Sequence, residues 1–142
     1  MSEAEKKRRI DEGENFRLSV WRGVGYCEVW RRPDVSVNQG TRYAAVLMNS
    51  LRSFLSDVEN PVPGLVFDLR EAAPVAGPNT LALLAELMTS WSLADRNIVL
   101  VVAWADQRDQ MEELIAKSAP GRAVVLQIQS GGDVEAALLL AA

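Results

Sequence analysis

The sequence predicts an α/β fold: a single domain with a mixed, mostly parallel sheet of four to five strands and helices mainly on one face. The first observation is the order of the central segment, in which a helical pattern at 78–94 separates apolar runs at 65–70 and 98–103. Two strands joined by a helix pair as parallel neighbours, because the connection is too long for a hairpin. The second observation is the alternation of apolar and polar residues at 16–32, which predicts an antiparallel β-hairpin at the start of the sheet.

The segment before the hairpin, residues 1–15, is charged and has no apolar period. We interpret it as an amino-terminal extension, either a frayed helix or disordered, with Ile10 as its one anchor, and we place the folded domain at 16–142. The basic cluster at 6–9 stands among acidic residues, which favours a solvated segment over a nucleic-acid-binding arm.

The predicted helices follow from apolar residues spaced three and four apart. A first helix is expected at about 41–58 and is ended by the Pro- and Gly-containing segment 60–64. The second helix is expected to begin at Pro78, with Gly77 as its N-cap or, alternatively, Asn79. The helices and the central strands together contribute the predicted core, which comprises Leu47, Leu51, Phe54, Val66, Leu69, Leu84, Leu87, Val99 and Val101.

The carboxy-terminal part is predicted as a charged helix at 106–118, a strand at 123–128 and a short helix at 133–141 with Asp133 as its N-cap. The strand is amphipathic, which is typical of the edge of a sheet. The charged helix carries four carboxylates: Asp106, Asp109, Glu112 and Glu113. We interpret them as a solvated face rather than a metal site, because the ligands of a metal converge from loops or from several elements.

The composition excludes several classes of chemistry. The chain has 142 residues, a net charge of −4 and no histidine, so Ser-His and Cys-His nucleophiles and His-based metal sites are excluded. The acidic balance argues against nucleic acid or an anionic membrane as the main partner. The one cysteine, Cys27, is predicted to be a buried thiol. Because there is no amino-terminal apolar run and the apolar end of the chain is too short to span a bilayer, we expect a cytoplasmic protein, and we expect neither a cofactor nor a metal.

Three stretches carry a resemblance to a known family. They are Val66-Phe67-Asp68-Leu69-Arg70 with the leucine-rich helix that follows, Asn97-Ile98-Val99-Leu100-Val101, and the closing Asp133-Val134-Glu135-Ala136-Ala137-Leu138. With the predicted order β-β-α-β-α-β-α-β-α, the chain resembles, over residues 16–141, the STAS domain shared by anti-sigma factor antagonists and the cytoplasmic tails of sulfate transporters. The resemblance implies a domain that acts by binding another protein.

In the anti-sigma factor antagonists, a turn with an Asp-Ser-Ser-Gly-like motif carries a serine that a partner kinase phosphorylates at the start of the second helix. The matching residues here, which the resemblance implies as the partner-binding surface, are Ala76, Gly77, Pro78, Asn79 and Thr80. This segment has no Asp and no Ser, so regulation by the usual serine phosphorylation is not expected. Thr80 is the candidate phosphorylation site, because a helix N-terminus accepts phosphate, but an ordinary helix-start residue is the favoured alternative.

The leading hypothesis is therefore a non-enzymatic protein-interaction module in bacterial signalling or regulation, similar to an anti-sigma factor antagonist. Its partner would be a kinase, an anti-sigma factor or a signalling scaffold. The alternative is a small-molecule or lipid-binding domain with a pocket lined by aromatic side chains, for which the candidates are Trp21, Tyr26, Trp30, Trp91 and Trp104.

An enzyme is the least favoured class. Asp68 and Glu71 are the one close carboxylate pair at a predicted strand end, and residues three apart in a strand point to opposite faces. We also predict a homodimer. If the hairpin lies at a sheet edge, Val29 and Trp30 would form an exposed apolar patch with Trp104, which stands at a strand end.

Overall fold

A computed structural model describes residues 7–31, 37–57, 59, 61–72, 76–119 and 121–142. The strands are β1 (Arg8–Glu12), β2 (Phe16–Trp21), β3 (Val24–Trp30), β4 (Gly64–Glu71), β5 (Asn97–Val102) and β6 (Ala123–Gln127). The helices are α1 (Val37–Leu55), α2 (Pro78–Leu93), α3 (Ala105–Ser118) and α4 (Glu135–Ala141). Gly77 is the N-cap residue of α2 and Pro78 its first residue, as the sequence predicts.

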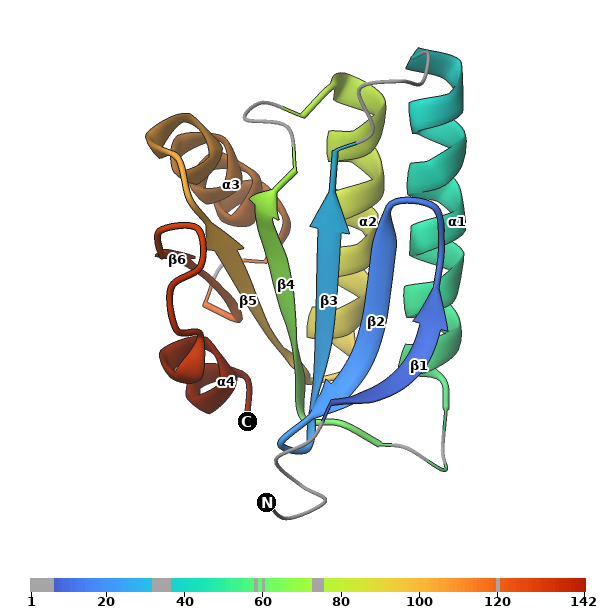
Figure 1. The fold of residues 1–142 in the computed structure, drawn as a ribbon, viewed down its shortest axis with the longest axis vertical. Helices are drawn as coiled ribbons and strands as arrows, with labels where there is room; N and C mark the ends of the chain where they lie inside the picture. The colour runs from blue at the N-terminus through green and yellow to red at the C-terminus, as the bar shows by residue number, and fades with distance from the viewer. Residues whose placement is uncertain (1–6, 32–36, 58, 60, 73–75, 120) are drawn as a thin grey trace.

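The six strands form one sheet in the order β1-β2-β3-β4-β5-β6 (Figure 1). Strand β2 is antiparallel to β1 and to β3, whereas each of the pairs β3–β4, β4–β5 and β5–β6 is parallel. The predicted parallel pairing at the centre is confirmed, since residues 64–68 of β4 lie in register with 97–101 of β5. The α/β class and the mixed sheet are confirmed. The prediction of four to five strands is wrong, and with two antiparallel pairings the sheet is mixed rather than mostly parallel.

The strand that the sequence did not predict is β1, which lies in the segment interpreted as a frayed helix or a disordered extension. It pairs with the outer edge of β2, and four of its five residues are exposed. An edge strand needs hydrogen bonds on one side only and little apolar surface. A charged edge strand therefore lacks the alternation of apolar and polar residues from which strands are predicted. Ile10 packs against the core as expected, and Ser50 of α1 donates a hydrogen bond of 2.5 Å to Asp11.

The predicted hairpin is confirmed as β2 and β3. Its turn residues Arg22 and Gly23 have φ values of 53° and 80°, and positive φ at both central residues is the geometry of a type I′ turn. Strand β3 lies between β2 and β4, so the prediction that Val29 and Trp30 lie at a sheet edge is wrong. The homodimer stays a prediction, and of its proposed patch Trp104 is 52% exposed.

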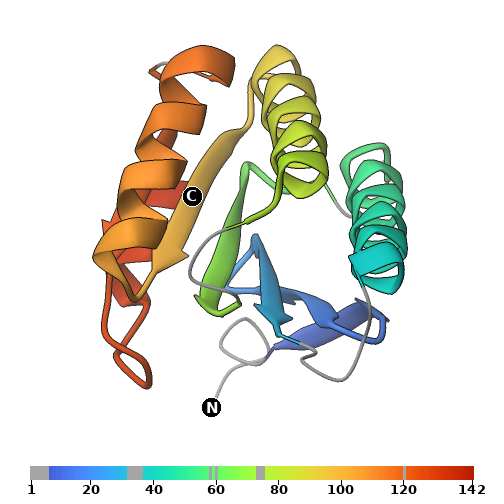
Figure 2. The ribbon, with the colours of Figure 1, turned by 90° about the horizontal axis from the view of Figure 1, so that it is seen from above.

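The two faces of the sheet are covered unequally. Helices α1, α2 and α3 pack on one face, as Figures 1 and 2 show, and α4 packs on the other. This agrees with the expected winding, because right-handed crossovers in one direction place successive helices on the same side. Every residue of the predicted core is buried, and Val66, Val99 and Val101 are the ones that face α4. Cys27 is fully buried in the larger layer, and burial raises the pKa of its thiol.

The carboxy-terminal elements differ little from those expected. Strand β6 is the edge of the sheet, as its amphipathic pattern predicts. Helix α4 begins at Glu135 rather than at 133, and its N-cap residue is Val134, so the prediction of Asp133 as the N-cap is wrong. Asp133 still lies beside the helix start, because its carboxylate accepts a hydrogen bond of 2.7 Å from the Glu135 backbone N–H. Within the described part of the chain, no helix combines the length and the hydropathy that crossing a membrane requires.

Candidate functional site

The segment predicted as the partner-binding surface lies where β4 leads into α2, at the carboxyl ends of the parallel strands. Gly77, Pro78 and Asn79 are exposed, and Ala76 and Thr80 are half-buried. The part of the connection at 73–75 lies outside the described residues. Ligands of open α/β sheets bind outside the carboxyl ends of the strands, so the segment occupies a favourable place for recognition.

A glutamine of α3 holds this segment in place. The Gln110 side chain accepts a hydrogen bond of 2.8 Å from the Ala76 backbone N–H and donates one of 3.0 Å to the Ala76 carbonyl oxygen. The amide therefore satisfies both backbone groups of one residue, as a neighbouring strand would. Gln110 was not predicted to contact this segment, because one glutamine in a charged helix carries no pattern that indicates its partner.

A second glutamine, Gln107, is buried beneath the same edge of the sheet. Its side-chain oxygen accepts hydrogen bonds from the backbone N–H groups of Ala103 at 3.0 Å and Trp104 at 3.3 Å. Its nitrogen donates to the Leu69 carbonyl oxygen at 2.8 Å. The end of β4 and the turn after β5 are thus fixed to α3, and α3 positions the candidate site from two points.

Replacing Gln110 by alanine is expected to release the start of α2 locally. We expect the hydrogen-exchange rate of the Ala76 amide to rise about tenfold and the free energy of unfolding to fall by about 1 kcal/mol, because a partly buried backbone pair loses its partner. Exchange measured by NMR checks this. Asp109→Ala on the exposed face of the same helix is the control, and equal exchange in the two variants would contradict the role of Gln110.

An apolar cavity of about 200 Å³, partly open to the surface, lies behind the segment, between the sheet and the three helices α1, α2 and α3. Most of its wall consists of apolar side chains, among them Val29, Leu47, Met48, Phe67, Leu84 and Met111. Ala76, Gly77 and Thr80 also line it. The predicted partner-binding surface is therefore at the same time one wall of a cavity.

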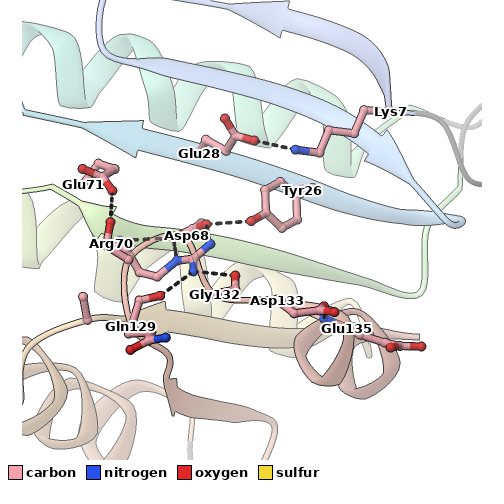
Figure 3. A network of polar contacts seen from close by, with 12 residues as sticks. Lys7, Tyr26, Glu28, Asp68, Arg70, Glu71, Gln129, Gly132, Asp133 and Glu135 are labelled. Carbon is pink, nitrogen blue, oxygen red and sulfur yellow. Dashed lines mark hydrogen bonds and ion pairs between the residues drawn. The ribbon is translucent and has the colours of Figure 1, made fainter.

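A buried ion pair lies on the opposite face of the sheet (Figure 3). Asp68 accepts a hydrogen bond of 2.6 Å from the Tyr26 hydroxyl, and Arg70 donates to it from Nε at 3.0 Å and from Nη2 at 2.9 Å. Burial raises the pKa of Asp68, but the hydrogen bonds from Arg70 and Tyr26 outweigh it and hold that pKa below its ordinary value. Burial, and then the bond to Asp68, raises the pKa of Tyr26 well above its ordinary value. The cluster therefore keeps a carboxylate and a neutral phenol at neutral pH.

Arg70 also fastens the loop that leads to α4. Its Nη1 donates to the carbonyl oxygens of Gln129 at 3.0 Å and Gly132 at 2.9 Å (Figure 3). Beside it, the Ser130 hydroxyl donates a hydrogen bond of 2.6 Å to Glu71. Two side chains at the end of β4 thus hold the connection between β6 and α4.

The carboxylates Asp68 and Glu71 line the same hollow of about 660 Å³ on the α4 side of the sheet. The alternation of a regular strand predicts opposite faces for them, and that prediction is wrong because β4 has a bulge. The register shifts there, so that Glu28 pairs with Asp68 but Trp30 pairs with Glu71. Both oxygens of Asp68 already accept hydrogen bonds from Tyr26 and Arg70, so Asp68 has a structural role in this geometry.

The five aromatic candidates for a ligand pocket do not lie together, and the aromatic ligand pocket stays a prediction. Trp21, Tyr26 and Trp30 line the α4-side hollow, whereas Trp91 is fully buried in the core and Trp104 is half exposed at the start of α3. The Lys7 ammonium lies 4.3 Å from the Trp21 ring centre and 2.9 Å from a Glu28 oxygen. The Lys7 ammonium therefore already contacts the Trp21 and Tyr26 rings, and the chain itself fills the space beside them.

Comparisons with known proteins do not identify a family. No protein-family model matches the chain, and neither a curated protein nor a solved structure matches it. Among the described residues, no group of three or more cysteine, aspartate or glutamate side chains is placed to hold a metal ion. The STAS resemblance therefore stays a prediction, and the function is argued from the geometry of this chain.

Proposed function

We propose that this chain is a STAS-like, non-enzymatic protein-interaction module of bacterial signalling, and that it contacts its partner through Ala76, Gly77, Pro78, Asn79 and Thr80. The observation that supports this most directly is that the exposed start of α2 is hydrogen-bonded to α3 and begins at a proline. Gln110 binds both backbone groups of Ala76, and Pro78 begins the helix directly after Gly77. A surface that is ordered before binding loses less conformational entropy when a partner docks.

The chemistry of the segment favours binding over catalysis. None of its five residues is ionisable, and the two glutamines beneath it use their amides to hold backbone groups. Thr80 supplies the one hydroxyl, and it is half-buried against an apolar cavity, where a phosphate would be poorly hydrated. We therefore interpret Thr80 as a helix-start residue, and phosphorylation is not part of the proposal.

The partner that we propose is a regulatory protein of the cytoplasm: a kinase, an anti-sigma factor or a signalling scaffold. The resemblance stated above supports this class, and the net charge of −4 favours a protein surface over nucleic acid. A buried, unpaired cysteine agrees with a reducing compartment.

Two charged substitutions at the start of α2 test the proposal. Asn79→Glu combined with Thr80→Glu is expected to weaken partner binding about 30-fold or more, because a central contact is worth about 2 kcal/mol and a buried unpaired charge adds a penalty. The partner is first captured from cell extract with the wild-type chain and identified. The dissociation constants are then measured by calorimetry with the purified partner.

The matched control places the same charges on the outer face of α1, with Asn49→Glu and Ser53→Glu, where both side chains are exposed. This control is expected to bind as the wild type does. Melting temperatures of both double variants separate lost contact from lost folding. Unchanged affinity in the Asn79 and Thr80 variant, or equal loss in the control, would remove this surface from consideration.

A further inference from the structure

The two edges of the sheet differ in their chemistry. Strand β1 ends the sheet on one side with the sequence RRIDE, in which four of five side chains are charged. Strand β6 ends it on the other side with AVVLQ, which contains no ionisable side chain. Exposed edges are commonly protected from pairing by charged side chains or by proline, and β6 lacks both. An edge strand of this kind is a place where another strand can be added.

Two hydrogen bonds fix which backbone groups of β6 point toward β5. The Ile98 N–H donates to the Arg122 carbonyl oxygen at 3.4 Å. At the other end of the strand, the Ile128 N–H donates to the Val102 carbonyl oxygen at 2.8 Å. In a parallel pair, alternate residues of a strand bond to the same neighbour, so the even-numbered positions of β6 are the ones that bond to β5.

The odd-numbered residues of β6 therefore direct their backbone groups to the open side of the sheet. These residues are Ala123, Val125 and Gln127, and in the described part of the chain no further strand lies beside them. The Ala123 N–H is already used, because it donates to the Ala119 carbonyl oxygen. A further strand would bind the N–H groups of Val125 and Gln127 and the carbonyl oxygens of all three residues.

The side chains of β6 bring apolar surface to the same edge. Val124 and Leu126 stand beside Val99 and Val101 of β5, and they lie with them on the α4 side of the sheet. Leu126 packs partly against that layer, whereas Val124 is 43% exposed. Removing this apolar area from water is favourable, so the edge offers hydrophobic contact in addition to hydrogen bonds.

The order of these groups points to a second copy of β6 as the added strand. In an antiparallel pair with a two-fold axis at Val125, this residue stands opposite its own copy and exchanges both hydrogen bonds with it. Ala123 then stands opposite Gln127, and Val124 of each copy stands opposite Leu126 of the other. Apolar side chains thus meet apolar side chains, whereas β1 of another copy would place charged side chains beside them.

The charge that lies next to β6 does not oppose this pairing. Arg122 precedes the strand, and its guanidinium is bound within the chain, since it forms an ion pair with Asp95 and donates to the Asn97 side-chain oxygen at 3.4 Å. The residues that follow the strand, 128–130, are uncharged. An antiparallel arrangement brings Arg122 of one copy to this uncharged end of the other, so like charges do not meet.

We propose that two copies of this chain associate through antiparallel pairing of their β6 strands, which joins the two sheets into one. A pair of five-residue strands is small compared with the roughly 1,200–2,000 Å² of a standard interface, so the dimer is weak, with a dissociation constant of about 100 μM. The association goes beyond the proposed partner docking and does not rest on it. The docking surface at 76–80 contains no residue of β6, so a dimer would present it twice to a partner.

Sedimentation equilibrium of the wild-type chain between about 10 μM and about 1 mM measures the association. We expect mainly monomer at the lowest concentration and mainly dimer at the highest. A monomer over the whole range would overturn the proposal.

A charge on the paired strand tests the surface. Val124→Glu is expected to weaken the association about tenfold or more, because the carboxylate would lie beside Leu126 of the other copy and lose hydration. The matched control is Val46→Glu on α1, where the side chain is 49% exposed, and it is expected to associate as the wild type does. Melting temperatures confirm that both variants fold. Equal association of the two variants would show that β6 is not the interface.

The arrangement of the two copies is tested by NMR on an equal mixture of isotope-labelled and unlabelled chains. We expect intermolecular NOEs between the methyl groups of Val124 and those of Leu126 in the other copy. Intermolecular NOEs to Trp104 instead, which is 52% exposed at the start of α3, would place the dimer elsewhere and overturn the proposal. These experiments use no partner protein, so their outcome is distinguishable from that of the docking test.

Discussion

Asp68→Ala is expected to lower the free energy of unfolding by about 3 kcal/mol, because the buried Tyr26 hydroxyl and the partly buried Arg70 guanidinium lose their shared acceptor. The Asp68 carboxylate accepts hydrogen bonds from Tyr26 and Arg70, and the side chains of the ion pair are each 10% exposed. Removing one member of a buried pair costs about 3–5 kcal/mol. The lower end applies because Arg70 keeps its bonds to the carbonyl oxygens of Gln129 and Gly132. Urea denaturation measures the change.

The control for this substitution is an ion pair at the surface. Arg108 and Glu112 lie 3.0 Å apart on α3, with side chains 50% and 51% exposed. Glu112→Ala is expected to change the free energy of unfolding by less than about 0.5 kcal/mol, because exposed pairs are screened by water. Similar losses in the two variants would contradict the structural role of the buried carboxylate.

The same carboxylate has a defined pH signature. Burial raises the pKa of Asp68, but the bonds from Arg70 and Tyr26 bring it below its ordinary value. A lowered pKa in the folded state gives stability that is fully present above the unfolded pKa of about 3.9 and is lost as pH falls through the folded pKa. The stability difference between wild type and Asp68→Asn is therefore expected to be constant near neutral pH and to shrink below about pH 4. A difference that grows in acid would contradict this sign.

The elements that could be predicted from sequence are those whose signal is local. The hairpin and the parallel pair β4–β5 followed from alternation, apolar runs and the length of the connection. Strand β1 could not be predicted in this way, because it is recruited by the free edge of β2 and needs no apolar face of its own. Its five residues, RRIDE, contain one apolar side chain, and no periodicity can be read from a single position.

The candidate site was predicted only in part, because its contacts depend on register and on packing. Tyr26 and Asp68 are 42 residues apart, and they meet because β3 pairs with β4 so that Tyr26 stands beside Val66, two residues before Asp68. Gln110 reaches Ala76 across 34 residues in the same way. The residue types of Gly77 and Pro78 predicted a helix start. The side chains that bind this turn, such as Gln110, could not be predicted from sequence.

Leu138→Ala is expected to lower the free energy of unfolding by about 3 kcal/mol, within the range of about 2–5 for buried leucines. Leu138 is 4% exposed and packs in the smaller layer with Val66, Val99 and Val101. Helix α4 has seven residues, too few to be stable alone, so its place on the sheet depends on this contact. Hydrogen exchange of the α4 amides is expected to accelerate in the variant.

The adjacent leucine provides the matched control, since Leu139 is 69% exposed in the same helix. Leu139→Ala is expected to change stability by less than about 0.5 kcal/mol, as is usual for surface positions. Sequence alone does not distinguish these two leucines, because they stand in an unbroken apolar run at the end of the chain. Equal losses would mean that α4 does not pack on the sheet through Leu138. A large loss for Leu138 alone would establish α4 as the cover of the sheet face that contains Asp68 and Arg70.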